Sequence, residues 1–171
     1  ILNYKFEIHL NDTSDIIYGS ADIALNIKDS EDRVRLDLIS QGKDGMGMEV
    51  KKVTFNGSEV SYSHHNDVLL IETGALEYSS RDIINVVYSG MPITGLIIGP
   101  NMHGDRTFFS DNWPNKARNW LPLVDHPYDK STAEFVVIAP NHYQVISNGL
   151  LVEETNLNNC LLYTSPSPRD A

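Results

Sequence analysis

The chain has 171 residues and a net charge of −10, with 23 acidic against 13 basic side chains. This acidic surplus would repel the phosphates of a nucleic acid, so no nucleic-acid partner is expected. No apolar run is long enough to span a membrane, and the length suits one domain with a sizeable hydrophobic core.

The end of the chain, Cys160–Ala171, differs from the rest. It follows a polar run, carries two Ser-Pro pairs and lacks a strand or helix pattern. Read back into codons, it resembles the translated end of a transposase adapter used in sequencing libraries. We therefore predict that residues 1–159 are an incomplete natural domain and that residues 160–171 are a non-native tail, the alternative being a natural disordered tail. The only cysteine, Cys160, lies in this tail, so no disulfide framework or thiolate metal site is expected before it.

Apolar and polar side chains alternate along much of the chain. In residues 4–10 every second residue is apolar, which places these side chains on one face of a strand. No window of about eleven residues carries the apolar stripe of a helix. Similar alternation or a β-rich run predicts further strands at residues 21–27, 34–38, 68–71, 83–88 and 134–139.

Two Asn-Gly pairs predict tight hairpin turns, because both residue types accept positive φ angles. Asn56-Gly57 lies between two β-rich runs, and Asn148-Gly149 separates predicted strands at residues 143–147 and 150–152. Glycine and proline break the pattern at residues 89–101. Strands that recur about every ten residues with turns between them are typical of all-β proteins. We therefore predict an all-β fold, either an antiparallel β-sandwich or a large curved β-sheet.

The stretch from Ser110 to Lys130, SDNWPNKARNWLPLVDHPYDK, has no regular period. A connection of about twenty residues is long, and such segments are usually functional or disordered. Its tryptophan, leucine and valine side chains need burial, so we predict an ordered, packed segment, called the corner loop below. Pro114 is expected to open a single helical turn within it. The alternative role is a packed corner that only closes one end of the sheet.

Several residues in and after the corner loop fall in a characteristic order. They are Arg118, Pro122, Asp125, Pro127, Lys130, Pro140 and the turn Ser147-Asn148-Gly149. The N-terminal domain of the aminopeptidase N-like zinc metallopeptidases, which include the leukotriene hydrolase branch, has this order of residues. The chain closely resembles that family over Thr107–Gly149, and its upstream strands extend the resemblance to residues 3–152.

The resemblance implies a fold and a partner. In this family the N-terminal domain is a curved β-sheet saddle, and a catalytic domain follows it in the same chain. The catalytic domain binds zinc through a His-Glu-x-x-His helix and a second Glu, and a Gly-x-Met-Glu-Asn loop grips the free amino group of the substrate. None of these motifs occurs here, and none of the six histidines has the required spacing. We therefore expect this chain to bind no catalytic zinc and to be inactive alone, with zinc and peptide substrate bound by the parent enzyme.

In the family, the loop before the arginine lends two side chains to the substrate cleft, seven and five residues before it. Counting back from Arg118, these positions hold Asp111 and Trp113, where the family commonly has Gln and then Gln or Glu. The resemblance thus implies substrate-binding roles for Asp111 and Trp113. Because an indole ring cannot accept a hydrogen bond, Trp113 would attract the α-ammonium by a cation–π contact, or would only fill the core. Arg118, Asp125 and Pro127 are expected to be structural, through ion pairing and turn bonds under the loop.

Three functions fit the sequence. The first is the N-terminal, non-catalytic domain of a zinc aminopeptidase that removes N-terminal residues from peptides, with this domain shaping one wall of the substrate cleft. The second is a free-standing β-sandwich that binds carbohydrate or protein, with Trp113, Trp120 and tyrosines stacking on sugars. The third is a non-catalytic relative that keeps the saddle for protein contacts. The compartment stays open between secreted, periplasmic and cytoplasmic.

Overall fold

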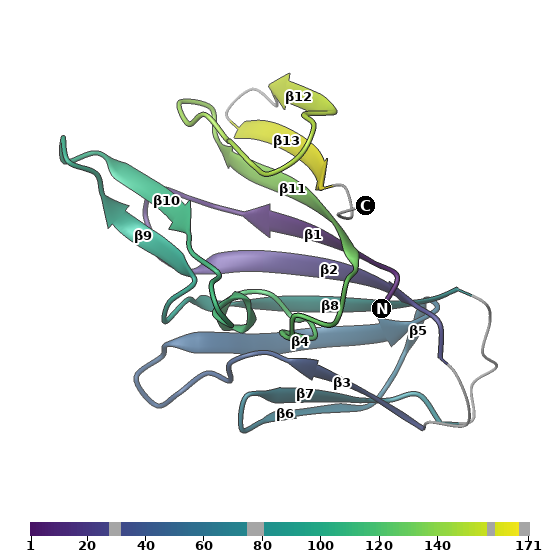
Figure 1. Ribbon diagram of the computed structural model, residues 1–171. Coiled ribbons are helices and arrows are strands. Elements are labelled where there is room, and N and C mark those ends of the chain that lie inside the picture. Colours follow the sequence, from purple (N-terminus) through teal and green to yellow (C-terminus); the bar gives the residue numbers. More distant parts are fainter. Residues whose placement is uncertain (28–31, 75–80, 157–159, 168–171) are drawn as a thin grey trace.

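The computed structural model describes residues 1–27, 32–74, 81–156 and 160–167 (Figure 1). This part of the chain contains no helix with the length and apolar character needed to cross a bilayer. The prediction of an all-β fold is confirmed. The described elements are, in chain order, β1 (Asn3–His9), β2 (Ile17–Leu25), β3 (Arg33–Asp37), β4 (Gly47–Phe55), β5 (Ser58–Glu59), β6 (Tyr62–His65), β7 (Val68–Glu72), β8 (Asp82–Met91), β9 (Leu96–Pro100), β10 (Arg106–Ser110), the 3-10 helix η1 (Ala117–Asn119), β11 (Thr132–Pro140), β12 (Glu153–Asn156) and β13 (Cys160–Ser167).

Most strands belong to one large sheet with the order β12-β13-β11-β1-β2-β8-β4-β5. Figure 1 shows these strands fanning from β12 at the top to β4 near the bottom. Strand β1 pairs with β11 in parallel, from Asn3 opposite Thr132 to His9 opposite Ile138, whereas the other neighbours in this sheet are antiparallel. The sheet is therefore mixed rather than purely antiparallel. Strand β2 occupies one edge of β1, so the other edge is open to β11, which arrives after a long connection.

A smaller sheet, β3-β7-β6, packs against the large one and shares a single hydrophobic core with it. Strand β8 shows the alternation that builds this core, since Ile84, Val86 and Tyr88 are buried while Ile83 and Val87 are exposed. This period of two follows directly from strand geometry. In and beside the smaller sheet, the apolar side chains of Leu36, Leu38, Leu69 and Ile71 are completely buried.

The hairpin turn predicted at Asn56-Gly57 is confirmed. It joins β4 to β5, and the two strands pair antiparallel with Phe55 opposite Ser58. Both turn residues have positive φ angles, 47° for Asn56 and 82° for Gly57. This is the conformation that an Asn-Gly pair accepts at small steric cost.

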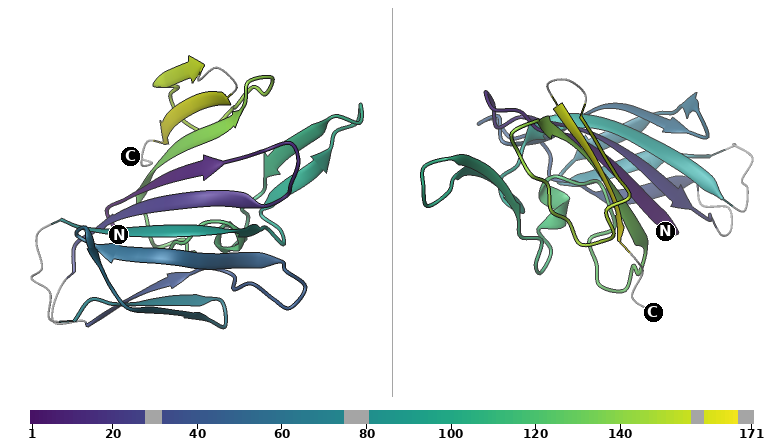
Figure 2. Two further views of the ribbon diagram at one scale, coloured as in Figure 1. Left: turned by 180° about the vertical axis from the view of Figure 1, so that it is seen from behind. Right: turned by 90° about the horizontal axis from the view of Figure 1, so that it is seen from above.

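Strands β9 and β10 form a hairpin that the sequence did not predict. Figure 2 shows it standing away from the large sheet in both views. Gly90 lies within β8, and Gly99 and Pro100 lie within β9, so the break in the pattern is limited to the turn between these two strands and is shorter than expected. Ile98 and Phe108, paired across the hairpin, pack against the core, whereas the next pair, Ile97 and Phe109, is exposed.

The last part of the chain corrects two predictions. Residues 143–147 and 150–152 are irregular rather than strands, so Asn148-Gly149 does not join a hairpin. Cys160–Ser167 does form a strand, β13, although no strand was expected there. The free edge of β11 offers unpaired backbone groups, and β13 pairs with it and buries Tyr163. Residues 168–171 lie outside the described residues, and the non-native origin of the tail stays a prediction.

Candidate functional site

The corner loop leaves β10 and is anchored first by its second tryptophan. Trp120 is only 6% exposed, its indole Nε1 donates a hydrogen bond to Asn112 Oδ1 at 2.9 Å, and its ring stacks on Phe135 of β11 with the centroids 6.3 Å apart. Gly95 lies against the loop with a φ of +80°, and a Cβ atom there would come 2.3 Å from the carbonyl oxygen of Lys116. Only glycine fits this contact, so the loop packs tightly over the start of β9.

An ion-pair network fastens the middle of the loop. Arg118 of η1 places its Nε 3.1 Å from Asp125 Oδ2, and its backbone N–H donates to the same carboxylate oxygen at 3.3 Å. Asp37, at the end of β3, accepts a hydrogen bond from the backbone N–H of Asp125 at 3.2 Å, and the same oxygen lies 3.6 Å from Arg118 Nη2. The backbone of Asp37 also exchanges two hydrogen bonds with Leu123. These contacts join the loop to the smaller sheet.

Tyr4 of β1 attaches the end of the loop to the large sheet. Its hydroxyl donates to Asp129 Oδ2 at 2.8 Å and accepts from the backbone N–H of Val124 at 3.0 Å. Burial raises the pKa of Tyr4 well above its ordinary value, so the hydroxyl stays neutral and able to donate. The backbone N–H of Asp129 donates to the carbonyl of His126, which closes a turn with Pro127 in its second position. Proline suits that position because its φ is fixed.

The start of the loop is exposed instead. Trp113, whose peptide bond to Pro114 is cis, is 80% exposed, so the expectation that its ring needs burial is wrong, and it does not fill the core. The carboxylate of Asp111 accepts a hydrogen bond from the Lys116 ammonium at 2.6 Å, and this bond lowers the pKa of Asp111 below its ordinary value. The helical turn expected after Pro114 is η1, which begins at Ala117. Asp111 and Trp113 are thus presented to solvent on a segment whose later residues are firmly held.

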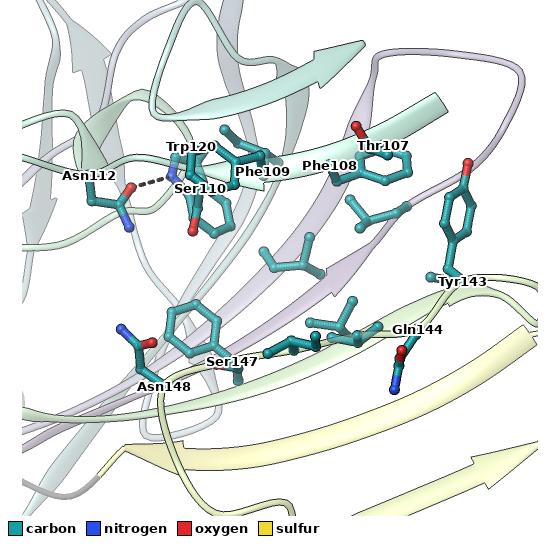
Figure 3. Close-up of a pocket in the computed structure, with 18 of the residues that line it drawn as sticks. Thr107, Phe108, Phe109, Ser110, Asn112, Trp120, Tyr143, Gln144, Ser147 and Asn148 are labelled. Carbon is teal, nitrogen blue, oxygen red and sulfur yellow. Dashed lines mark hydrogen bonds between the residues drawn. The ribbon is translucent and has the colours of Figure 1, made fainter. Parts of the chain in front are cut away.

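A cleft of about 660 Å³ lies beside the corner loop (Figure 3). Its walls come from β10 and the loop on one side and from β11 and the irregular residues after it on the other. Asn112 lines the cleft, whereas its neighbours Asp111 and Trp113 do not. The aromatic and polar lining residues are Thr107, Phe108, Phe109, Ser110, Asn112, Trp120, Phe135, Tyr143, Gln144, Ser147 and Asn148.

The sequence identified the loop but missed Asn112 and Asp37. The family resemblance implied roles for Asp111 and Trp113, and it implied none for Asn112, which lies between them. Asp37 acts 88 residues away from Asp125, and the sequence pattern showed it only as a polar residue of an alternating strand. No local signal could have linked it to Arg118.

In the ranges that the structure describes, no group of three or more His, Cys, Asp or Glu side chains is placed to hold a metal ion. The adjacent histidines His64 and His65 point differently, since His64 Nε2 lies 2.9 Å from the carbonyl oxygen of Leu38 and His65 is exposed. The described side chains therefore do not fit a catalytic zinc.

A family model of the peptidase M1 N-terminal domain matches residues 2–165. The chain belongs to the family of peptidase M1 N-terminal domains. This M1 N-terminal domain is 25% identical over 123 residues to a leucyl aminopeptidase from Saccharolobus solfataricus. The aligned residues make up 70% of this chain and 15% of the relative.

Solved structures show the same fold. The M1 zinc metallopeptidase from Deinococcus radiodurans superposes with a TM-score of 0.80 at 19% identity, covering 97% of this chain and 38% of that one. Native leukotriene A4 hydrolase from Saccharomyces cerevisiae gives a TM-score of 0.76 at 20% identity, covering 99% of this chain and 27% of that one. The M1 N-terminal domain thus spans well under half the length of each of these relatives.

Proposed function

We propose that this M1 N-terminal domain is the non-catalytic N-terminal part of a zinc aminopeptidase that removes N-terminal residues from peptides. The exposed start of its corner loop forms one wall of the substrate cleft beside the catalytic domain of the same chain. The observation that carries the proposal is the contrast within the loop. Arg118, Asp125, Asp37 and Trp120 hold its base, while Trp113 is presented to solvent although a tryptophan ring is costly to expose.

Trp113 is the residue that we assign to the substrate's α-ammonium group. A cation placed over an indole face gains about 0.5–2 kcal/mol. Asp111 supports the site less directly, because Lys116 already occupies its carboxylate at 2.6 Å. A substrate ammonium would have to compete with this lysine, so Asp111 acts by holding the loop's shape as well as by its charge.

Zinc belongs to the catalytic domain in this proposal. That domain would supply the metal and the zinc-activated water, and this chain contributes only binding and positioning. A chain with this function has no activity alone. Recovering the longer gene would test the point at once, since a continuation without a His-Glu-x-x-His motif contradicts the proposal.

The kinetic test uses the full-length enzyme with Trp113→Ala. Loss of a contact made equally in the ground and transition states raises KM by about 2- to 30-fold and leaves kcat nearly unchanged. Trp113→Phe, which keeps an aromatic face, should recover part of the loss. Tyr128→Ala is the matched control, because Tyr128 is an exposed aromatic residue at the other end of the same loop. Wild-type kinetics for Trp113→Ala would reject the assigned role.

A carbohydrate-binding module is the competing function, and the geometry gives it less support. Sugar stacking needs an open aromatic face. Trp120 is buried and one of its faces stacks on Phe135, so the two tryptophans do not form a common platform. A glycan-binding screen of the 171-residue chain separates the two functions, because saturable glycan binding that is lost in Trp113→Ala would favour the module.

A further inference from the structure

The chain contains two Asn-Gly pairs, Asn56-Gly57 and Asn148-Gly149, and the structure places them in opposite surroundings. Asparagine followed by glycine is the pair most prone to spontaneous deamidation, because glycine has no side chain to hinder attack by its own backbone nitrogen. The reaction also needs a mobile asparagine side chain and a backbone that can bend toward it. The two sites therefore form an internal comparison within one fold.

Asn56 is held in place at the β4–β5 turn. Its Nδ2 donates to Asp82 Oδ1 at 3.0 Å, and its Oδ1 accepts from the backbone N–H of Ile83 at 2.9 Å. Its own backbone N–H donates to the carbonyl of Ile83 at 2.8 Å. Asp82 is completely buried, so this anchor is part of the sheet rather than a surface contact. The amide of Asn56 cannot rotate toward Gly57 without breaking both side-chain bonds.

Asn148 has none of these restraints. It is exposed and lies in the irregular segment between β11 and β12. Its side chain makes no hydrogen bond to any other residue within the described ranges of the chain. Figure 3 shows it at the rim of the cleft, at the same end as Asn112 but on the opposite wall. We propose that Asn148 is a site of spontaneous deamidation in the folded chain and that Asn56 is protected from it.

The chemistry needs only water. The backbone nitrogen of Gly149 attacks the Asn148 side-chain carbonyl carbon, an N–Cγ bond forms, and the Cγ–Nδ2 bond breaks. The nitrogen of Gly149 loses its proton and ammonia leaves, which gives a cyclic succinimide. Water then opens the ring at one of its two carbonyls, giving either aspartate or isoaspartate. No oxidant, reductant or enzyme takes part.

The product changes the rim of the cleft. Each converted molecule gains one carboxylate, which moves the net charge from −10 to −11. Isoaspartate also lengthens the backbone by one methylene at residue 148. A negative charge at this rim would disfavour acidic ligands and favour basic ones. This inference rests on the two Asn-Gly sites alone and does not depend on the proposed aminopeptidase function.

The test incubates the 171-residue chain in ¹⁸O-enriched water at mildly alkaline pH and follows both sites by peptide mapping with mass spectrometry. In the native chain, label should enter residue 148 at least about tenfold faster than residue 56, because two hydrogen bonds must open at Asn56 before reaction. In urea the two sites should react at similar rates, since the folded restraints are gone.

Two variants complete the test. Gly149→Ala should slow labelling at residue 148 and leave residue 56 unchanged, because a Cβ atom hinders the attacking nitrogen. Asn148→Gln should abolish the fast phase and leave a homogeneous charge profile. Equal native rates at the two sites, or an unlabelled Asn148 in a native chain whose urea-unfolded form is labelled, would overturn the inference.

Discussion

The sandwich core is held together by apolar burial, whereas the corner loop combines two buried apolar side chains, Trp120 and Leu121, with a network of polar contacts. Between the sheets, completely buried apolar side chains such as Ile84 and Leu36 provide the contacts. Arg118 and Asp125 of the loop make hydrogen bonds and ion pairs with each other and with Asp37 of β3. Apolar burial contributes to the stability of the whole sheet, whereas polar bonds of this kind fix one local geometry. Changes in the core should therefore affect the global fold, and changes in the network should affect mainly the loop.

The largest effect is expected from Ile84→Ala. Ile84 of β8 is 0% exposed, and truncating such a side chain costs about 2–5 kcal/mol in free energy of unfolding, because a cavity remains. Ile83→Ala is the matched control on the same strand, since Ile83 is 44% exposed and should cost less than about 1 kcal/mol. Urea titration of the 171-residue chain measures both. Similar losses for the two variants would mean that β8 does not bury one face.

A smaller and more local effect is expected from Asp37→Asn. The substitution keeps the shape but removes the charge that faces Arg118, at an expected cost of about 1–3 kcal/mol. Limited proteolysis should then cut within residues 110–130 faster, while β-sheet circular dichroism is retained. Arg35→Gln removes the exposed partner of Asp37, 67% exposed and 3.5 Å away, and should cost less than about 1 kcal/mol. Unchanged cleavage of the loop in Asp37→Asn would show that the network does not hold it.

The same contrast explains how much the sequence could predict. Alternation placed Tyr4, Phe6 and Ile8 of β1 on one face, and all three are buried, since side-chain direction in a strand depends only on neighbours two residues apart. In β8 the strand was predicted but its buried face was not, because most of its residues are apolar. The Asn56-Gly57 turn was equally local. The parallel pairing of β1 with β11 was not predicted, because it depends on which strand edge is free after β2 has paired.

The candidate site was predictable only in part. The order of residues around Arg118 pointed to this loop, in which the structure places Asp111 half-exposed and Trp113 exposed, and their substrate-binding roles stay predictions. The burial of Trp120 and the exposure of Trp113 could not be separated, since both are tryptophans in a segment without a period. Trp120 Nε1 donates a hydrogen bond to Asn112 Oδ1, and no pattern in the sequence indicates this contact.

The smallest expected effect concerns one half-buried polar contact of the smaller sheet. His64 of β6 is half-buried, and its Nε2 lies 2.9 Å from the carbonyl oxygen of Leu38. Burial lowers the pKa of His64 below its ordinary value of 6.5, while Asp67 acts in the opposite direction and His65 in the same one. The folded chain therefore takes up a proton at this residue less readily than the unfolded chain.

The sign of the pH dependence follows from this difference. Above about pH 6.5 both states hold a neutral imidazole, so His64 imposes no penalty. As the pH falls below that value, the unfolded chain binds the proton first and the folded state loses stability until the folded pKa is passed.

Many carboxylates also titrate in acid, so the test is the difference between the wild type and His64→Gln in urea titrations at about pH 7.5 and about pH 5. Over this pH interval, His64→Gln should lose less free energy of unfolding than the wild type. His65→Gln is the control and should lose as much as the wild type, because the His65 ring is exposed on the opposite face of β6. If His64→Gln lost as much stability as the wild type over this interval, the half-buried imidazole would not be a source of acid sensitivity.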